Sequence, residues 1–306
     1  MAHESVLLKE AVDMLVTDRT GIYVDGTFGR GGHSRAILQK LDVDGHLLAI
    51  DRDPQAVTAA GELKNDQRFA IEHGQFAQMS GLIEEHGWKG QVSGVLLDIG
   101  VSSPQLDDHS RGFSFLGDGP LDMRMDSSSG ITAASWLASA DENEIIKVLR
   151  EYGEEKFARR MAKAVLEKRQ EQAITTTAQL AEIISEANPR WEKGKHPATR
   201  AFQAIRIHIN DELGQLRTAL EQALDILAPG GRLVVISFHS LEDRIVKQFI
   251  RQKARGEFVH ASIPIMDKDI VRRMRPVGKA IKPSEEEVDA NPRSRSAVMR
   301  VAEKLL

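Results

Sequence analysis

The chain has 306 residues, of which 41% are hydrophobic, and a formal net charge of −4. This length and apolar content suit a soluble globular protein with two domains, or with one domain that carries a large insertion. The lack of cysteine excludes disulfides, thiolate catalysis and cysteine-ligated metal, and the net charge excludes a globally basic nucleic-acid binder. Without a signal-peptide pattern or an apolar run that could span a bilayer, the sequence predicts a cytoplasmic protein with no membrane partner.

The first strong pattern in the chain is a strand, a glycine turn and a helix start within residues 21–34. A predicted helix over residues 7–15 leads into an apolar, β-prone run at residues 22–24, and four glycines follow within seven residues. Glycine permits positive φ and lets a ligand approach the backbone, while the helix that opens near His33 points free amides and its positive dipole end at that ligand. The turn therefore predicts a binding site for a polar or anionic group.

The next predicted strand, residues 46–50, ends at Asp51, twenty residues after Gly31. A carboxylate at this distance, on the tip of the second strand, is placed to accept both hydroxyls of a ribose. The two patterns together predict a nucleoside cofactor. The simpler alternative is an ordinary strand, turn and helix with a capping aspartate.

The glycine spacing separates two cofactors. An NAD site requires a third glycine where Ser34 stands, whereas the S-adenosylmethionine pattern has an acid at the strand end and glycines at alternate positions. Asp25, Gly29 and Gly31 match that second pattern, and Thr27 departs from it where a first glycine is usual. The sequence favours S-adenosylmethionine and keeps an NAD-dependent dehydrogenase as the rival enzyme.

Two further strands are predicted to end in the same crevice, because the carboxyl ends of parallel strands lie at one edge of an open sheet. Residues 68–72 lead to Phe76, which either covers an adenine ring or belongs to the core. Residues 92–98 end at Asp98. The Ser103-Pro104 pair that follows is predicted as a rigid, extended turn that presents a hydroxyl to a planar amine.

From residue 107 to about residue 210 the alternation of strand and helix stops. Residues 108–126 form a long stretch without periodicity, which indicates a functional loop. A long helix is expected from about Thr199 to Leu227, and shorter helices are expected over residues 133–138, 142–152, 154–170 and 178–187. We expect an inserted helical substrate-recognition domain at 107–210 within a discontinuous cofactor domain of residues 1–106 and 211–306.

The C-terminal part of the chain completes the predicted sheet. Residues 232–238 have the strongest strand pattern, and residues 296–301 form a closing strand. Between them, Ser240 is predicted to cap a basic helix that runs to Lys253, and residues 254–290 are expected to be loop-like. The predicted fold class is α/β, a Rossmann-like class I methyltransferase sheet with an inserted all-helical domain.

His239 lies close to Ser240 and Glu242 in the sequence. This combination suggests a hydrolase triad, but the nucleophile elbow Gly-x-Ser-x-Gly is missing. We infer no hydrolase.

Basic residues gather in two stretches that are candidates for phosphate contacts, with an ordinary solvated surface as the alternative. The two stretches are Arg190, Lys193, Lys195, Arg200 and Arg206, with Glu192 as the only acid between them, and Arg272, Arg273, Arg275, Lys279 and Lys282, with no acid between them.

Five stretches, in this order over nearly the whole chain, closely resemble the ribosomal RNA small subunit methyltransferase H family, also called MraW. They are Asp25-Gly-Thr-Phe-Gly-Arg-Gly-Gly-His33, residues 94–105 with Leu-Asp-Ile-Gly-Val-Ser-Ser-Pro-Gln, the Arg-Gly-Phe-Ser-Phe loop of residues 111–115, His196-Pro-Ala-Thr-Arg200, and Ser237-Phe-His-Ser-Leu-Glu-Asp-Arg244.

The resemblance implies S-adenosylmethionine-dependent methylation of the exocyclic N4 of a cytosine in the decoding region of bacterial 16S ribosomal RNA. The partner that the resemblance implies is this 16S ribosomal RNA within the small ribosomal subunit. The resemblance implies no metal. The cofactor would lie on the family's binding positions, which fall on Gly31, Gly32, His33, Asp51, Phe76, Asp98 and Gln105.

Methyl transfer to an amine needs no nucleophilic side chain, because the sulfonium is already a strong electrophile and the enzyme must chiefly align the two reactants. Asp98 and Ser103 are the candidate catalytic residues, since acceptors on the two N4 hydrogens favour a pyramidal nitrogen. A base hidden by stacking must also be unstacked into the crevice.

Other functions and properties stay open on the residues alone. A non-catalytic RNA-binding or assembly protein is one alternative, and methylation of DNA or of a small amine is another, disfavoured only by the resemblance. The residues also leave open the proton acceptor, free RNA or an assembled subunit as the substrate, and the oligomeric state, with a homodimer as one candidate.

Overall fold

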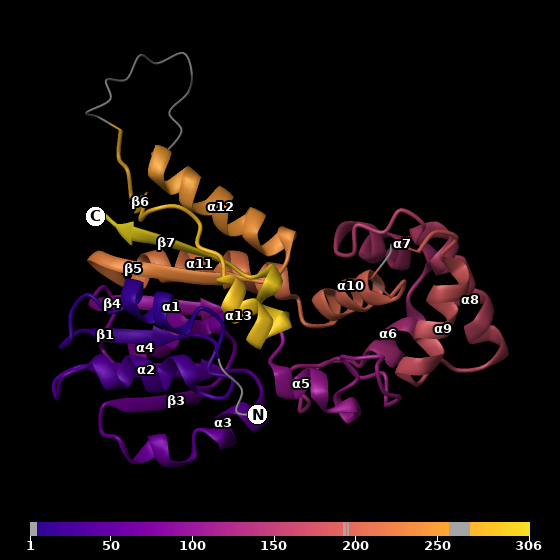
Figure 1. Cartoon of the computed structure of the whole chain (residues 1–306), viewed down its shortest axis with the longest axis horizontal. Helices are drawn as coiled ribbons and strands as arrows, with labels where there is room; N and C mark the ends of the chain where they lie inside the picture. The colour runs from indigo at the N-terminus through magenta and orange to yellow at the C-terminus, as the bar shows by residue number, and fades with distance from the viewer. Residues whose placement is uncertain (1–4, 192–193, 195, 257–269) are drawn as a thin grey trace. The chain divides into compact units, whose positions relative to one another are not determined.

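The computed structural model describes residues 5–191, 194, 196–256 and 270–306. The chain divides into two compact units (Figure 1). Met1–Gly100 and Leu213–Leu306 form the sheet unit, and Val101–Glu212 form the helical unit. The helical unit thus starts six residues before the predicted insertion at 107 and ends two residues after 210.

In the described residues of the sheet unit, seven strands form one sheet in the order β3-β2-β1-β4-β5-β7-β6. The pairs among β1 to β5 are parallel, whereas β7 runs antiparallel to both β5 and β6. This confirms the predicted Rossmann-like α/β fold. The strands are β1 Ile22–Asp25, β2 His46–Asp51, β3 Phe69–His73, β4 Val92–Asp98, β5 Leu227–Ser237, β6 Met274–Pro276 and β7 Val298–Lys304.

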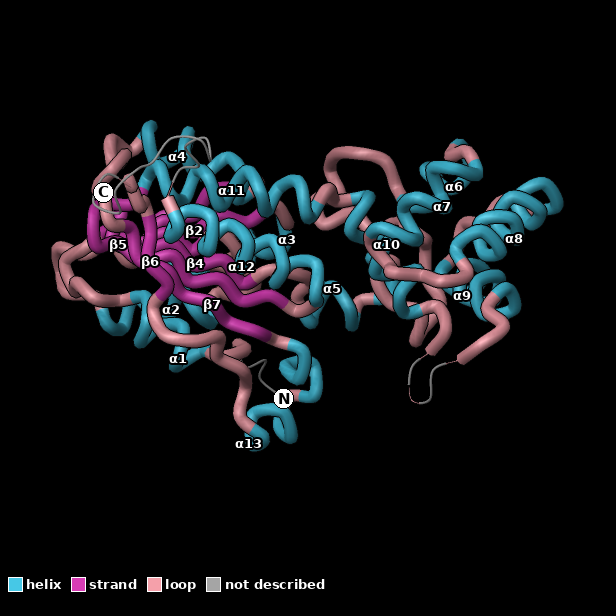
Figure 2. The backbone as a smooth tube through the Cα atoms, turned by 90° about the horizontal axis from the view of Figure 1, so that it is seen from above, coloured by secondary structure: helices cyan, strands magenta, loops and turns pink. Residues whose placement is uncertain are grey.

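Helices cover both faces of this sheet (Figure 2). The helices of the sheet unit are α1 Leu8–Leu15, α2 Gly32–Lys40, α3 Pro54–Ala59, α4 Met79–Glu85, α11 Glu212–Ile226, α12 Ser240–Arg255 and α13 Glu285–Ala290.

Alternate residues of the central strands enter two separate cores, because side chains of a strand point to opposite faces. Tyr23 and Leu47 pack with apolar residues of α1 and α2, whereas Val24 and Leu48 pack with those of α4 and α11. All four side chains are fully buried. Burial on both faces explains why these strands stand out in the sequence as continuous apolar runs.

Three boundaries in the sheet unit differ from the prediction. Asp53-Pro54 in the sequence predicts a helix start and a helix to about Leu63, but α3 ends at Ala59 and is followed by a 3-10 helix. The strand expected from Arg232 begins at Leu227, which pairs with Val92 before the register shifts. The stretch 254–290, expected to be loop-like, contains β6 and α13 among its described residues. Met274–Pro276 forms β6 because it pairs with β7 and so becomes the edge strand of the sheet.

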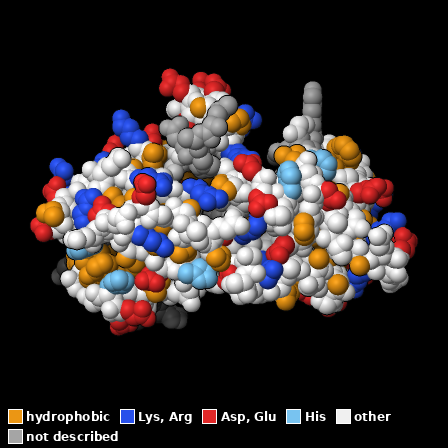
Figure 3. Space-filling model, turned by 90° about the horizontal axis from the view of Figure 1, so that it is seen from below, with side chains coloured by type: hydrophobic (Ala, Val, Ile, Leu, Met, Phe, Trp, Pro, Cys, Tyr) orange, Lys and Arg blue, Asp and Glu red, His pale blue; other side chains and the backbone are white. Residues whose placement is uncertain are grey.

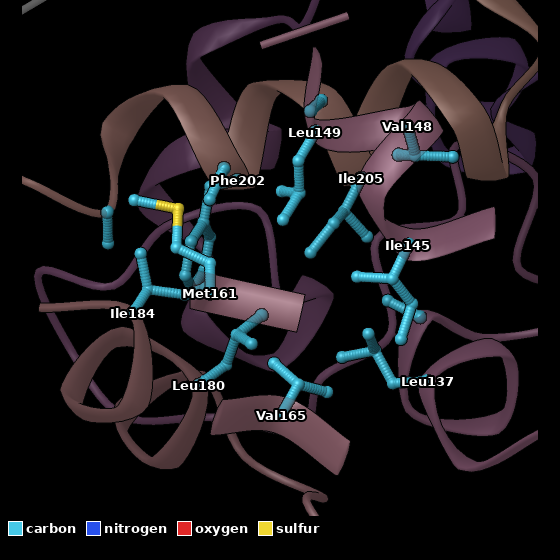
Figure 4. Packing of buried hydrophobic residues seen from close by; sticks show 14 of the residues in the cluster. Leu137, Ile145, Val148, Leu149, Met161, Val165, Leu180, Ile184, Phe202 and Ile205 are labelled. Carbon is cyan, nitrogen blue, oxygen red and sulfur yellow. The ribbon is translucent and has the colours of Figure 1, made fainter. Parts of the chain in front are cut away.

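The helical unit packs its helices around one apolar core. Figure 4 shows Leu149, Met161 and Ile205, from three different helices, pointing into this core. Side chains of Thr132, Asp141 and Thr176 accept backbone amides at the starts of three helices, which fixes where those helices begin. The helices are α5 Ser103–Asp107, α6 Ala133–Ser139, α7 Glu142–Glu151, α8 Ala158–Glu171, α9 Thr177–Ala187 and α10 Thr199–Ile209.

The long helix expected from Thr199 to Leu227 is wrong, because the structure has two helices there. α10 ends at Ile209, and α11 starts at Glu212. Between them Asp211 has a φ of 47°, a left-handed conformation that interrupts the helical hydrogen-bond ladder. Good helix formers on both sides of this break hid it in the sequence.

The side chain of Asn210, at the end of α10, holds the aperiodic stretch 108–126 in place. Its Nδ2 donates to the carbonyls of Met123 and Arg206, at 2.7 and 2.9 Å, and its Oδ1 accepts the amide of Met125 at 2.8 Å. Asn210 is 3% exposed. The stretch 108–126 is therefore an ordered part of the helical unit. Buried polar contacts fix it, and these contacts cannot be predicted from the periodicity of the sequence.

We predict that Asn210→Ala lowers the free energy of unfolding of the helical unit by about 2–4 kcal/mol, because it leaves buried backbone groups of Met123 and Met125 without their partners. Denaturant unfolding measures the change. Asn188→Ala is the matched control, since Asn188 makes a local bond to the amide of Arg190 at the surface. Equal effects of the two substitutions would contradict the role given to Asn210.

Candidate functional site

Three aspartates lie at the carboxyl ends of neighbouring parallel strands. Asp25 ends β1, Asp51 ends β2 and Asp98 ends β4. A fourth carboxylate, that of Glu242, lies in the first turn of α12, directly after β5. Because β1, β2, β4 and β5 are neighbours in the sheet, these groups line one crevice, where open parallel sheets bind their ligands.

The glycine turn between β1 and α2 has the backbone that the sequence predicts. Gly29 and Gly31 have φ of 56° and 73°, and Gly31 precedes the first residue of α2. A side chain on Gly31 would collide with the Phe28 ring, 2.6 Å from the position of its Cβ, whereas the space beside Gly29 is open. The turn thus leaves room for a ligand at Gly29.

Gly32 faces a different neighbour. A Cβ there would lie 2.0 Å from Oγ of Ser5, so the chain near its N-terminus occupies the space beside this glycine. Gly32 is therefore needed for close packing, and its contact with a cofactor stays a prediction.

Asp51 is held by backbone amides on both carboxylate oxygens. Its Oδ2 accepts from Gly29 at 2.7 Å, and its Oδ1 accepts from Asp53 at 2.8 Å. Burial raises the pKa of Asp51, and the two amides act against that rise. Each oxygen keeps a second lone pair, so the group can still accept the hydroxyls of a ribose.

Two residues that depart from the glycine patterns have clear structural roles. Ser34, where an NAD site has its third glycine, donates from Oγ to Oδ2 of Asp25 at 2.6 Å. Thr27, where the methyltransferase pattern has its first glycine, accepts at Oγ1 the backbone amide of Asp98 at 2.7 Å. The Thr27 hydroxyl thus ties the tip of β4 to the turn after β1, a role that sequence reasoning missed.

Asp25 is buried and titrates in an unusual range. It also accepts the amide of Thr27 at 3.1 Å. Burial is the main cause that raises the pKa of Asp25 to about 6, and repulsion from Asp51 adds to it, while the donors Ser34 and Thr27 lower it. This carboxyl group is therefore sensitive to any charge that enters the crevice.

His33 and Asp98 face each other without forming an ion pair. The His33 Nδ1 lies 3.6 Å from Oδ2 of Asp98, and its Nε2 lies 3.2 Å from the carbonyl of Val6, which can only accept. Burial lowers the pKa of His33 to about 4, so the ring is neutral near pH 7 with its proton on Nε2. Burial, together with Asp25 and Glu242, raises the pKa of Asp98 well above its usual range.

One oxygen of Asp98 is left for a ligand. Its Oδ1 is buried and has no hydrogen-bond partner among the described residues. Buried polar atoms without a partner are rare, and each calls for a group that satisfies it. A polar or cationic ligand in the crevice meets that need.

Sequence reasoning missed Glu242 as a crevice residue. Its side chain is fully buried, and Oε2 accepts the amides of Phe238 and His239 at 2.8 and 3.2 Å. Its Oε1 lies 2.9 Å from Nε2 of His239. The predicted cap at Ser240 is wrong, because His239 is the capping residue and Ser240 is the first residue of α12. An acid three residues after a helix cap was the pattern that could have shown this.

Ser103 and Gln105, both predicted site residues, belong to the helical unit. The extended turn predicted for Ser103-Pro104 is wrong, because Ser103 is the first residue of α5 and Pro104 occupies the first helical turn, where its missing amide costs nothing. Gln105 is buried, and its Oε1 accepts the amide of Ser102 at 3.0 Å. Their roles at the cofactor or the amine stay predictions.

Phe76 opens a short 3-10 helix after β3 and packs, half-buried, against the core beneath α4 and α11. Its Cβ lies 3.2 Å from where a Cβ on Gly26 would be, which places Phe76 beside the glycine turn. A role in covering an adenine ring stays a prediction.

The basic cluster at residues 190–206 is described only in part. Lys193 and Lys195 lie outside the described residues. Arg206 donates from Nε and Nη2 to the two carboxylate oxygens of Glu212, at 2.7 and 2.8 Å, and both side chains are largely buried. The prediction that Arg206 contacts a phosphate is therefore wrong, because its guanidinium makes an internal ion pair with Glu212.

Comparison with known proteins decides the family. The MraW methylase family matches residues 1–305. The chain belongs to that family. The resemblance predicted from the motifs is confirmed, and with it a methylase that uses S-adenosylmethionine, so the rival dehydrogenase is excluded.

Two relatives carry the name ribosomal RNA small subunit methyltransferase H. The protein from Chromohalobacter salexigens is 61% identical over 304 residues, which cover 99% of this chain and 92% of that protein. The protein from Shewanella amazonensis is 56% identical over 306 residues and covers 99% of this chain and 98% of that protein. Among solved structures, an rRNA methylase from Streptococcus thermophilus is 12% identical, with a TM-score of 0.41 over 98% of this chain and 94% of that chain, a likeness too distant to bear on function.

We predict that Asp51→Ala weakens binding of S-adenosylmethionine by about 1–3 kcal/mol, the cost of ribose hydroxyls that lose their acceptor. Calorimetry on a variant shown to be folded measures the loss. Asp44→Ala, at an exposed turn of the same unit, is the control. Unchanged affinity in Asp51→Ala would remove Asp51 from the cofactor site.

We also predict a pH-dependent effect of Asp25→Asn on the stability of the cofactor-free protein. Between an ordinary pKa of 3.8 and the folded value of about 6, the unfolded carboxyl group releases its proton while the folded one keeps it. The wild type should therefore lose stability relative to the variant as the pH rises from 4 to 7, by up to about 3 kcal/mol.

Denaturant unfolding across this pH range measures that difference, with Asp44→Asn as the matched loss of one carboxylate. A difference between wild type and Asp25→Asn that stays constant with pH would contradict the burial of an ionisable group at Asp25.

Proposed function

We propose that this protein transfers a methyl group from S-adenosylmethionine to the exocyclic N4 of a cytosine in the decoding region of bacterial 16S ribosomal RNA. The names of the two relatives support a small-subunit ribosomal RNA as the substrate class. The observation that carries the chemistry is the buried, unsatisfied Oδ1 of Asp98 in a crevice of carboxyl groups beside an open glycine turn.

The crevice suits a cationic cofactor. When bound, S-adenosylmethionine supplies an electrophilic methyl group on a positively charged sulfur. Asp51 would accept the ribose hydroxyls, and the open backbone at Gly29 would let the cofactor approach the start of α2. Asp25 and Asp98 would supply negative charge for the sulfonium, and their raised pKa values would fall again once that cation is present.

The N4 amine of the cytosine must be activated for attack on the methyl group. The N4 lone pair of cytosine is delocalised into the ring, so acceptors on the two N4 hydrogens favour the pyramidal nitrogen that can attack. We assign this role to the Ser103 hydroxyl and to Asp98, which also holds a carboxylate oxygen ready for a donor. Neither residue is needed as a nucleophile, because N4 itself attacks the electrophilic methyl group and alignment of the two reactants lowers the barrier.

The helical unit is proposed to recognise the RNA. Four rings form a ladder from its core to its surface: Phe202, Phe115, His196 and Trp191, with successive ring centroids 4.9, 4.5 and 6.5 Å apart. Phe202 is buried, and Trp191 at the other end is 66% exposed. An exposed ring supported from behind suits stacking of an unpaired base, the usual way in which proteins read single-stranded RNA. Arg190 and Arg200 remain the candidates for phosphate contacts.

Purified protein tests the proposal directly. Methyl-labelled S-adenosylmethionine is incubated with small ribosomal subunits that lack their native methylation, and the RNA is digested to nucleosides. The label should appear in N4-methylcytidine at one position, and Asp98→Ala should abolish it. Label on another atom or another base would contradict the assigned target.

We predict that Ser103→Ala lowers the single-turnover rate of methyl transfer more than it weakens cofactor binding, because the lost hydroxyl acts on the amine. Rapid-mixing kinetics with saturating cofactor measures the rate. Ser110→Ala removes a hydroxyl from an exposed site nearby in the sequence and serves as the control. A normal rate in Ser103→Ala would leave Ser103 as a structural residue of α5.

A further inference from the structure

Helix α12 carries a stripe of basic residues, here called the basic stripe: Arg244, Lys247, Arg251 and Arg255. Their spacings of three, four and four residues put them on one face of the helix. All four side chains are exposed, whereas Val246, Phe249 and Ile250 on the other side are buried. α12 packs against β5, β6 and β7 and so presents the stripe away from the sheet.

Among the described residues, acids do not neutralise the three basic residues Lys247, Arg251 and Arg255 of this stripe. The two acids of α12 are engaged elsewhere, since Glu242 holds backbone amides and Asp243 accepts both Nε and Nη2 of Arg300, at 2.6 and 3.0 Å. In the part of the chain that the structure describes, no carboxylate pairs with Lys247, Arg251 or Arg255.

Other surfaces of the protein look different. On the face in Figure 3, lysine and arginine side chains are interspersed with acids. Exposed lysines of α8 are likewise paired, as Lys163 with Glu167 and Lys168 with Glu171. Lys247, Arg251 and Arg255, which have no acid partner among the described residues, therefore distinguish α12 from α8, and an anion relieves the repulsion between them.

The stripe leads into a cavity of about 640 Å³ at the C-terminal end of α12. No acid is among the described residues that line it: Gln248, Arg251, Gln252, Lys253, Arg255, Gly256, Val271 and Arg273. Lys253 and Arg273 are partly neutralised from outside by Glu221 and Asp225, at 2.7 and 3.4 Å. Arg251 and Arg255 belong to both the stripe and the cavity.

The stripe extends from the cofactor crevice to the opposite edge of the sheet. α12 begins directly after the carboxyl end of β5, where Glu242 lines the crevice, and its 16 residues run back along the sheet. At 1.5 Å per residue this is about 24 Å. A polyanion bound along the stripe would have one end beside the crevice.

We propose that the basic stripe and the cavity at its end bind the sugar–phosphate backbone of RNA. Cations one helical turn apart lie about 5–6 Å from each other, and guanidinium groups hold phosphate through paired hydrogen bonds. The inference rests on the proposed function for its ligand, since that function makes RNA the polyanion that must reach the crevice. It adds a second RNA surface, on the sheet unit, to the one proposed for the helical unit.

The test is the salt dependence of binding to small ribosomal subunits and to protein-free 16S ribosomal RNA. The triple variant Lys247→Ala, Arg251→Ala, Arg255→Ala removes three charges from the stripe. Lys9→Ala, Lys64→Ala, Lys89→Ala removes three exposed charges elsewhere on the sheet unit and is the matched control. The slope of log Kd against log salt should fall by about 2–3 for the first variant and stay unchanged for the second. Thermal stability and cofactor affinity should match the wild type in both.

Two outcomes of this binding test would overturn the inference. Equal slopes for the two triple variants would make the stripe an ordinary solvated surface. Loss of affinity for subunits but not for protein-free RNA would identify an acidic ribosomal protein as the ligand. Failure of the proposed function gives a distinct result, because a wild type that binds RNA through the stripe but leaves no N4-methylcytidine would keep this inference and remove the assigned reaction.

Discussion

The structure depends on the burial of carboxyl groups at one edge of a parallel sheet. Asp25, Asp51 and Asp98 end three neighbouring strands, and Glu242 follows a fourth. The strand order therefore places all four carboxyl groups in one crevice. Burial raises the pKa values of the three aspartates, and repulsion from neighbouring carboxylates adds to that rise. Backbone amides and the hydroxyl of Ser34 offset part of this cost.

The same constraint links stability to function. A cation in the crevice offsets the repulsion between the buried carboxylates. A positively charged cofactor that binds there therefore stabilises the folded protein by mass action. RNA carries the opposite charge, and in the proposed reaction one of its bases must approach this crevice. We propose that the basic stripe of α12 holds phosphates of that RNA away from the acids, so that only a neutral base enters.

Most of the sheet unit could be predicted, because strands buried on both faces appear as continuous apolar runs and the glycine-rich turn after β1 has a recognisable sequence. Spacing alone predicted that Asp51 ends a strand beside the glycine turn, and the structure has both there. What the sequence concealed depends on contacts between distant residues: the bond from Asp98 to Thr27 spans 71 positions, and Glu242 reaches the crevice only because β5 lies beside β4. The break at Asp211 was hidden for another reason, since local helix propensity continues on both sides of it.

The central claim is that this chain places one methyl group on N4 of a cytosine in small-subunit ribosomal RNA. The most direct measurement is mass mapping of methylated nucleosides in 16S ribosomal RNA from a strain that lacks the gene, beside the parent strain. The account predicts that one N4-methylcytidine of the decoding region disappears and returns with the wild-type gene but not with Asp98→Ala. A map identical to that of the parent would contradict the account.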